Sequence, residues 1–537
     1  MTSQPLASTP AHPASILAVV CGAAFTINLA TTAVNIALPT LSRELTASTQ
    51  QLQWIVDAYN LVFATFVLAA GSLSDRFGRK GALQVGLVIF GAAAVAASFA
   101  TSPAQLIAGQ AVMGMGAAVI YPTTLSIISN VYVQRTQRAR AIGLWGAVTG
   151  VGVASGPIMA GWLIEHAAWP GIYVCMAGLA GLTIVAVSRV VVTSRDPATP
   201  PLDRLGLLLS VLAMATLVYT IIEAPTRGWA RLPTLGGFAV AAALLVLFLG
   251  WERQRSAPMV DLGLLRNPRF TAASGAITAA FFALFGFIFV ITQYFQLLHG
   301  YGPLSTGLRI TPVAVSIAVG SLAGTALAVR IGNKMIVAVG LLLLGAAFAW
   351  VAAVVTASTA YSTVAEQMIL MGLGVGATAV PATEAIMGAV PKEKAGIGSA
   401  MNDATRELGG TLGVAVVGSV FASVYATTLA TASIAQQLPP QALATVRSSM
   451  TAALAIANRM PDGPAAQVVA AANHAFLRGL TAGSFVAAGV ALAGALLAAV
   501  FLPARPSTAA AAPAVRVGRT EDLQLTGDGR ADGSGAP

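Results

Sequence analysis

Fourteen apolar stretches, each long enough to cross a lipid bilayer as a helix, recur along this chain of 537 residues. About 20 apolar residues are needed for one crossing. Only 9% of the residues are charged, whereas a soluble domain carries roughly 25%. We therefore expect an all-α integral membrane protein with 14 transmembrane helices. The expected spans are 14–38, 53–72, 81–100, 104–127, 140–163, 168–190, 205–224, 232–252, 270–293, 306–329, 335–357, 363–389, 407–429 and 478–502.

Basic residues are distributed unequally between the two sides of these spans. Of the 29 Lys and Arg, 22 fall on one side and 7 on the other, and none is left for the middle of a span. Cytoplasmic loops carry the excess of positive charge, so both termini are expected in the cytoplasm. The formal charge of +10 is scattered over these loops, which fits anionic lipid better than a nucleic-acid groove. Arg outnumbers Lys 25 to 4, which, with the many Ala and Gly residues, is typical of a GC-rich bacterial genome. The expected location is the bacterial plasma (inner) membrane.

Three segments lie outside the expected spans. Residues 1–13 are predicted to be a cytoplasmic tail, and residues 506–537, rich in Ala, Pro, Gly and Asp, a disordered one. Residues 430–477 are predicted to form an external loop that packs against helix ends. Cys21 and Cys175 both fall inside spans, so neither a disulfide nor a metal site is expected, and we expect no cofactor.

The second half of the sequence repeats features of the first. Residues 330–334 parallel residues 76–80, and Pro381 parallels Pro122, at offsets of 254 and 259 residues. Both offsets equal eight helices, and an even number keeps the two copies in the same orientation. We expect two pseudo-symmetric six-helix lobes, separated by a linker with two inserted helices. The predicted boundaries are 14–190, 191–255 and 256–505, the last including the external loop.

One short charged segment interrupts this apolar chain between its second and third spans. Its glycines permit a tight turn and close helix approach, and its acid can pair with a neighbouring arginine. We expect the segment to form a loop at the membrane surface with a conformational role. The residues concerned are Gly71, Asp75, Arg76, Gly78, Arg79 and Lys80.

Small residues recur every fourth position within span 140–163. Such spacing places them on one helix face, where a second helix can approach closely. Pro157 removes a backbone hydrogen bond and favours a bend. Gly152, Gly156 and Gly161 are therefore expected at a close helix contact, and ordinary glycine-mediated packing is the alternative to a special role.

These motifs together resemble the major facilitator superfamily of secondary transporters. The segment Gly71–Lys80 is similar to the loop between that family's helices 2 and 3, and the run 150–161 to its antiporter motif. Residues 54–61 and 399–410 resemble the fourteen-helix drug:proton antiporter branch. The resemblance covers about residues 14–430 and implies proton-coupled efflux by alternating access, with loop 71–80 closing the cytoplasmic side. Ala30 and Gln110 depart from the family pattern, which has an aspartate and an arginine there.

Proton coupling needs a titratable group inside the bilayer. The four histidines fall outside the expected spans, so carboxylates are the candidates. A charge inside the bilayer is costly, so an acid is expected in a span only where it has a structural or functional role. Asp57 and Glu384, in opposite lobes, are our candidates for coupling or substrate contact, with structural hydrogen bonding as the alternative. A solvated or capping role is at least as well supported for Glu223, Glu366, Asp403 and Glu407.

Substrate-binding residues are suggested by family position alone: Asn35, Phe281, Phe285, Tyr294 and Gln296. The expected substrates are amphiphilic or cationic small molecules, exchanged for protons by a monomer. Two alternatives remain open. One is a facilitator, or an exporter of one metabolite or lipid-like compound; the other is a membrane sensor that binds without turnover. An enzyme is not expected, because the chain has no HExxH, P-loop or nucleophile-elbow motif.

Overall fold

The computed structural model describes residues 12–194, 203–255, 258–390 and 395–503. Every regular element within these ranges is helical. The long helices of the first half are α1 (Pro13–Glu44), α2 (Thr49–Phe77), α3 (Arg79–Ser98), α4 (Pro103–Val131), α5 (Arg135–Ala167), α6 (Pro170–Val190), α7 (Arg204–Arg227) and α8 (Leu232–Glu252). Those of the second half are α10 (Pro268–Gln293), α11 (Pro303–Ile331), α12 (Asn333–Val354), α13 (Tyr361–Ala389), α14 (Ala395–Ala430) and α17 (Asp462–Phe501).

Each long helix overlaps one of the expected spans. Thirteen helices among the described residues are long and apolar enough to cross a membrane. The second expected span, 53–72, lies in α2, which carries the polar residues Gln53, Asp57 and Asn60 and is not among these thirteen. The membrane-protein fold class is thus confirmed, whereas the exact count of fourteen is not. Both predicted terminal tails lie largely outside the described residues, at 1–11 and 504–537.

The same helix pairs pack together in the two halves of the chain. In the N-terminal lobe (α1–α6), α1 packs on α5, α2 on α4, and α3 on both α4 and α6. In the C-terminal lobe (α10–α14 and α17), α10 packs on α14, α11 on α13, and α12 on both α13 and α17. These are equivalent pairs at an offset of eight spans, so the contacts follow the repeat predicted from sequence.

Glycine turns mark the repeat at residue level. Gly78 joins α2 to α3 with φ +115°, and Gly332 joins α11 to α12 with φ +90°. The backbone N–H of each glycine donates to the carbonyl four residues earlier, in Ser74 and Ala328. Because side chains disfavour positive φ, only glycine fits these turns without strain.

We expect Gly78→Ala to lower the stability of the protein by about 1–3 kcal/mol, the usual cost of such backbone strain. Gly81→Ala is the matched control, because Gly81 lies in α3 and an added Cβ would meet open space there. Thermal unfolding in detergent measures both variants. Equal melting temperatures for the two would contradict the strain at Gly78.

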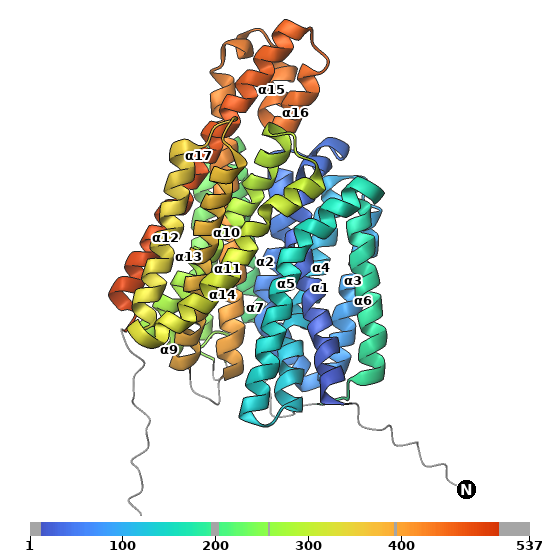
Figure 1. Ribbon diagram of the computed structural model, residues 1–537, viewed down its shortest axis with the longest axis vertical. Coiled ribbons are helices and arrows are strands. Elements are labelled where there is room, and N and C mark those ends of the chain that lie inside the picture. Colours follow the sequence, from blue (N-terminus) through green and yellow to red (C-terminus); the bar gives the residue numbers. More distant parts are fainter. Residues whose placement is uncertain (1–11, 195–202, 256–257, 391–394, 504–537) are drawn as a thin grey trace, which may run out of the picture.

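Two faces of the bundle can be distinguished in Figure 1. The terminal face is the end where α1 begins and α17 ends, and the cap face carries α15 (Pro440–Ser448) and α16 (Met450–Ala457). The lobes meet along two helix pairs, α2 with α14 and α5 with α11. Hydrogen bonds join the lobes in the cap-face half: Gln53 Nε2 donates to the Ala415 carbonyl at 3.1 Å, and Leu304 N to Glu165 Oε1 at 2.9 Å.

The expected external loop 430–477 is largely helical. It contains the short 3-10 turn η3 (Ser433–Gln436), α15, α16 and the start of α17. The predicted packing against helix ends is present: the Tyr425 hydroxyl donates to the Val446 carbonyl at 3.2 Å, and Thr49 Oγ1 to the Ser448 carbonyl at 2.8 Å. The expected start of the last span at residue 478 is wrong, because α17 is a single helix of 40 residues that begins at Asp462.

Candidate functional site at the lobe interface

A buried polar stripe runs along the face of α2 that meets the other lobe. Gln53, Asp57 and Asn60 are spaced by four and three residues, which places them on one helix face. Gln53 Nε2 bonds α14 at the Val414 and Ala415 carbonyls. Asp57 is 0% exposed, and neither of its carboxyl oxygens has a hydrogen-bond partner among the described residues. This isolation sets Asp57 apart from an acid held by structural hydrogen bonds.

A second polar group lies on α14, across the interface from α2. The expected start of this span at residue 407 is wrong, because α14 begins at Ala395. Asp403, Arg406 and Glu407 therefore lie inside the helix rather than before it. Asp403 is buried, and Glu407 Oε2 is buried without a hydrogen-bond partner among the described residues.

Sequence reasoning placed Asp403 and Glu407 at a helix end and did not single out Arg406, because charged residues end a hydropathy pattern. The signal that could have found this group is spacing: positions 403, 406 and 407 lie on one face of a helix, as residues i, i+3 and i+4.

Two tyrosines of the N-terminal lobe lie close to these charges. Tyr121 of α4 interacts electrostatically with Asp403, Arg406 and Glu407, and Tyr59 of α2 interacts with Glu407. Both tyrosine side chains are buried. The carboxylates of one lobe thus lie within electrostatic range of phenol groups of the other.

A series of aromatic rings continues from Tyr59 and Tyr121 into the N-terminal lobe. Tyr59, Phe63 and Tyr121 form successive edge contacts, with ring centroids 6.2 Å and 5.7 Å apart. Trp145 of α5 continues the series 5.0 Å from Tyr121, and its Nε1 donates to Thr124 Oγ1 at 3.1 Å. The rings are held in place by packing and by this hydrogen bond, which makes the surface rigid.

The C-terminal lobe contributes two further rings from α10. The Arg406 guanidinium lies 4.5 Å from the centroid of Phe281, a cation–π distance. Phe285 lies 6.2 Å from Phe281 and packs against Gly410 of α14. We call the set Tyr59, Tyr121, Phe281, Asp403, Arg406 and Glu407 the interface cluster. It combines one guanidinium with two carboxylates and aromatic faces, and the carboxylates and aromatic faces are groups that bind organic cations.

Only Phe281 and Phe285 of the five expected substrate residues lie at the interface cluster. Tyr294 is fully buried within its own lobe, where its hydroxyl donates to the Thr356 carbonyl at 2.7 Å. Gln296 joins the lobes near the cap face, donating to the Ile36 carbonyl of α1 at 2.9 Å. Asn35 is buried in α1, and its Oδ1 has no partner among the described residues.

Glu384 lies in a different environment from Asp57. It occupies the terminal-face half of α13, and its side chain is exposed. The side chain of Glu384 is therefore not enclosed by the protein, whereas that of Asp57 is. The coupling role of Glu384 stays a prediction.

Two of the histidines lie in long helices: His166 is the next-to-last residue of α5, and His474 lies in the first half of α17. His299 follows η1 (Tyr294–Leu298), a π-helical turn at the end of α10, and stacks on Tyr301 at 5.3 Å. Burial lowers the pKa of His299, so this ring is neutral at neutral pH.

The glycines of the antiporter-like run make close contacts, as expected. A Cβ on Gly152 would lie 2.9 Å from the Phe25 carbonyl oxygen, and one on Gly156 2.8 Å from the Leu29 oxygen, both in α1. A Cβ on Gly161 would lie 2.6 Å from Leu304 Cα, in α11 of the other lobe. In addition, a Cβ on Gly307 of α11 would meet the Pro157 carbonyl. This face of α5 thus packs within its lobe at one end and across the interface at the other.

The charged segment 71–80 is held against its own lobe. A Cβ on Gly71 would lie 3.5 Å from Pro122 Cβ, an ordinary contact. Arg79 N donates to the Ser194 carbonyl at 3.0 Å, and Lys80 Nζ to the Ser188 carbonyl at 2.8 Å. Arg76 lies in the last turn of α2. The side chain of Asp75 lies outside those that the structure describes.

Comparison with known proteins agrees with this architecture. The sequence model of the Major Facilitator Superfamily matches residues 20–414. "Multidrug resistance protein Stp" of Mycobacterium tuberculosis is 33% identical over 405 residues, which is 75% of each chain. "Multidrug efflux pump LfrA" of Mycolicibacterium smegmatis is 30% identical over 492 residues, covering 92% of this chain and 97% of that one.

A solved structure supports the fold independently. The inward-facing, unoccupied structure of a bacterial homologue of the human lysosomal transporter Spinster has a TM-score of 0.64 to this chain. It covers 93% of this chain and 99% of that one at 16% identity, so the likeness concerns the fold alone. The chain belongs to the major facilitator superfamily, as the sequence motifs predicted.

Proposed function

We propose that this protein exports amphiphilic or cationic small molecules from the cell in exchange for protons, by alternating access. The single observation that carries this proposal is the interface cluster, where two carboxylates of one lobe lie within electrostatic range of a tyrosine of the other. Its relatives Stp and LfrA are named as multidrug resistance and efflux proteins, which supports the substrate class.

The cation site is assigned to the interface cluster. Aromatic faces attract organic cations by about 0.5–2 kcal/mol each. With Asp403 and Glu407 ionised and Arg406 charged, the cluster holds one net negative charge. One monovalent cation or one proton balances this charge, so drug and proton compete for it. Competition of this kind is the simplest basis for exchange.

Asp57 is assigned as the coupling acid on the N-terminal lobe. An ionised carboxylate that is buried without a hydrogen-bond partner is strongly unfavourable, so the closed interface favours the protonated form. When the lobes separate on the cap face, water reaches the α2–α14 contact and Asp57 can take up a proton from the outside. In the inward-facing state, a cation bound at the interface cluster favours release of that proton. The proton thus moves with the change in access.

The family's usual acid and arginine are replaced by neutral residues, and this favours coupling through Asp57. Ala30 is buried, and Gln110 Nε2 donates to the Tyr173 hydroxyl at 3.4 Å in the same buried region. A neutral pair avoids the cost of one unpaired charge. The runner-up function, a facilitator or an exporter of one metabolite without proton coupling, also rests on this replacement.

The terminal face is assigned to the cytoplasm of a bacterial inner membrane, because 22 of 29 basic residues belong to that side. Hydrogen bonds between the lobes lie in the cap-face half, so the structure corresponds to an inward-facing state. Loop 71–80 would close the cytoplasmic side in the opposite state.

Purified protein in proteoliposomes tests the proposal, with ethidium, a fluorescent aromatic monocation, as the probe. When one side of the membrane is made acidic, ethidium is expected to accumulate on the acidic side. Adding ethidium should in turn accelerate the flux of protons across the membrane. Collapse of the proton gradient with an ionophore should abolish accumulation. Ethidium movement that ignores the gradient would identify a facilitator, and binding without counterflow would identify a sensor.

A further inference from the structure

The two inserted helices form a hairpin that contacts both lobes. α7 packs on α8, on α2 of the N-terminal lobe and on α14 of the C-terminal lobe. A helix that touches both lobes cannot keep both contacts fixed while the lobes move apart. It must travel with one lobe and slide on the other, and the chemistry of each contact indicates which.

The contact between α7 and α2 is made of apolar and aromatic side chains. Leu61 of α2 belongs to a buried cluster with Val218, Ile221 and Ile222 of α7. Trp54 of α2 lies with its ring 6.2 Å from that of Tyr219. Apolar contacts are non-directional, so such surfaces can slide without leaving polar groups unpaired.

The contact with the C-terminal lobe includes directional bonds as well. Ala415 of α14 belongs to the same buried cluster. At the cap-face end of the hairpin, Trp229 Nε1 donates to Ser423 Oγ of α14 at 3.0 Å. Sliding would break this bond, which holds the hairpin to α14.

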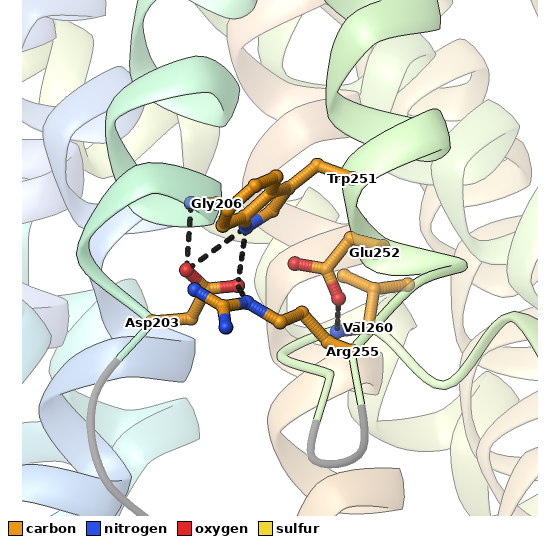
Figure 2. A network of polar contacts seen from close by, with 6 residues as sticks. All are labelled: Asp203, Gly206, Trp251, Glu252, Arg255 and Val260. Atoms are coloured by element: carbon orange, nitrogen blue, oxygen red, sulfur yellow. Dashed lines mark hydrogen bonds and ion pairs between the residues drawn. The ribbon is translucent and has the colours of Figure 1, made fainter.

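A network at the other end fixes the hairpin to the chain that enters the C-terminal lobe (Figure 2). Asp203, the N-cap of α7, accepts from Gly206 N at 3.0 Å and from Trp251 Nε1 of α8 at 2.9 Å. Arg255 lies 3.7 Å from the same carboxylate and 4.2 Å from the Trp251 ring centroid. The carboxylate therefore binds both ends of the hairpin together.

Glu252 extends this network to the next segment. Its Oε2 accepts from Val260 N at 3.1 Å, just before α9 (Leu262–Leu265), which packs on α10. Asp203 and Glu252 are 7% and 2% exposed, so these bonds are shielded from water. Buried charged hydrogen bonds are strong and directional, and they suit a permanent joint.

We propose that the hairpin α7–α8 is a moving part of the C-terminal lobe, and that it slides on α2 to keep the α2–α14 seam closed to lipid. Leu61 lies one helical turn from Asp57, so the sealed seam adjoins the coupling acid assigned above. The inference rests on the proposed alternating access. It assigns Asp203, Trp251, Glu252 and Arg255 a positioning role.

Cross-linking within the buried cluster tests the proposal. In a background with Cys21→Ala and Cys175→Ala, one pair joins the hairpin to α2, Leu61→Cys with Val218→Cys. The matched pair, Val218→Cys with Ala415→Cys, joins it to α14. A cross-link to α2 should cause loss of ethidium exchange, restored by reduction, whereas a cross-link to α14 should leave exchange unchanged. The reverse pattern, an equal effect of both, or failure of either pair to cross-link would overturn the proposal.

A distance measurement separates this proposal from the transport function. Spin labels at Leu208→Cys with Leu73→Cys report on α7 and α2, and Leu208→Cys with Thr427→Cys report on α7 and α14. Between low and high pH, the first distance should change and the second should stay constant. A constant α7–α2 distance, with a changing α7–α14 distance, would overturn the inference even if ethidium is transported.

Single substitutions test the network itself. Trp251→Phe keeps the ring and removes the Nε1 donor, and it should broaden the α7–α14 distance distribution. Trp162→Phe is the matched control, because Trp162 is an exposed tryptophan on α5. An unchanged distribution in Trp251→Phe would show that the network does not position the hairpin.

Discussion

Replacing Asp57 with asparagine is expected to abolish proton-driven accumulation while leaving the fold intact. A proton gradient of one pH unit supplies about 1.4 kcal/mol, which can sustain a gradient of roughly tenfold in a monocation exchanged for one proton. Without a group that takes up and releases the proton, this gradient should fall to unity. Downhill exchange of ethidium should persist, because Asp57 is not part of the interface cluster.

The fold should tolerate Asp57→Asn because neither carboxyl oxygen has a hydrogen bond to lose among the described residues. Accumulation and downhill exchange in proteoliposomes measure the two effects separately, and thermal unfolding checks stability. Glu366→Gln is the matched control, since Glu366 is an exposed acid on α13. Accumulation at the original level in Asp57→Asn would refute the coupling assignment.

Glu407→Gln is expected to weaken binding of an organic monocation by about 10- to 100-fold, because a charged hydrogen-bond partner contributes about 1.5–3 kcal/mol. It should also flatten the pH dependence of binding. In the unmodified protein, acidification protonates the carboxylates and removes the negative charge that holds the cation, so affinity should fall as pH falls. With Glu407 neutral at every pH, that dependence should be reduced.

Equilibrium binding of ethidium, followed by fluorescence at several pH values, measures this effect. A neutral aromatic ligand serves as the internal control, because its affinity should change little in Glu407→Gln. Glu384→Gln should leave cation affinity close to the original value, since Glu384 is exposed and lies outside the interface cluster. A larger loss in Glu384→Gln than in Glu407→Gln would move the cation site to α13.

Helix number and repeat were largely predictable, because both depend on local composition. Apolar runs of about 20 residues specify helices in a bilayer, where every backbone group must bond within its own segment. The turns at Gly78 and Gly332 were predictable for a similar reason, since positive φ requires glycine. The errors arose at polar helix ends: α14 begins 12 residues before the expected start, because charges mask a helix from hydropathy.

The candidate site was only half predictable. An acid inside an apolar run is conspicuous, so Asp57 was found from the sequence alone. Glu407 and Asp403 were also identified as acids near a helix end. The sequence alone, however, does not distinguish a solvated helix end from a buried interface between lobes. The position of Glu384 in an apolar run likewise says nothing about which way its side chain faces.

The sequence alone determined that this chain crosses a membrane many times, in two related halves joined by an inserted pair of helices. These properties follow from hydrophobicity and from glycine geometry, which act over a few residues. Only the tertiary structure decided that Gln53 bonds α14, that Tyr121 lies within electrostatic range of Asp403, and that Asp203 binds Trp251. Those contacts join residues far apart in the chain, and packing between helix faces, rather than composition, brings them together.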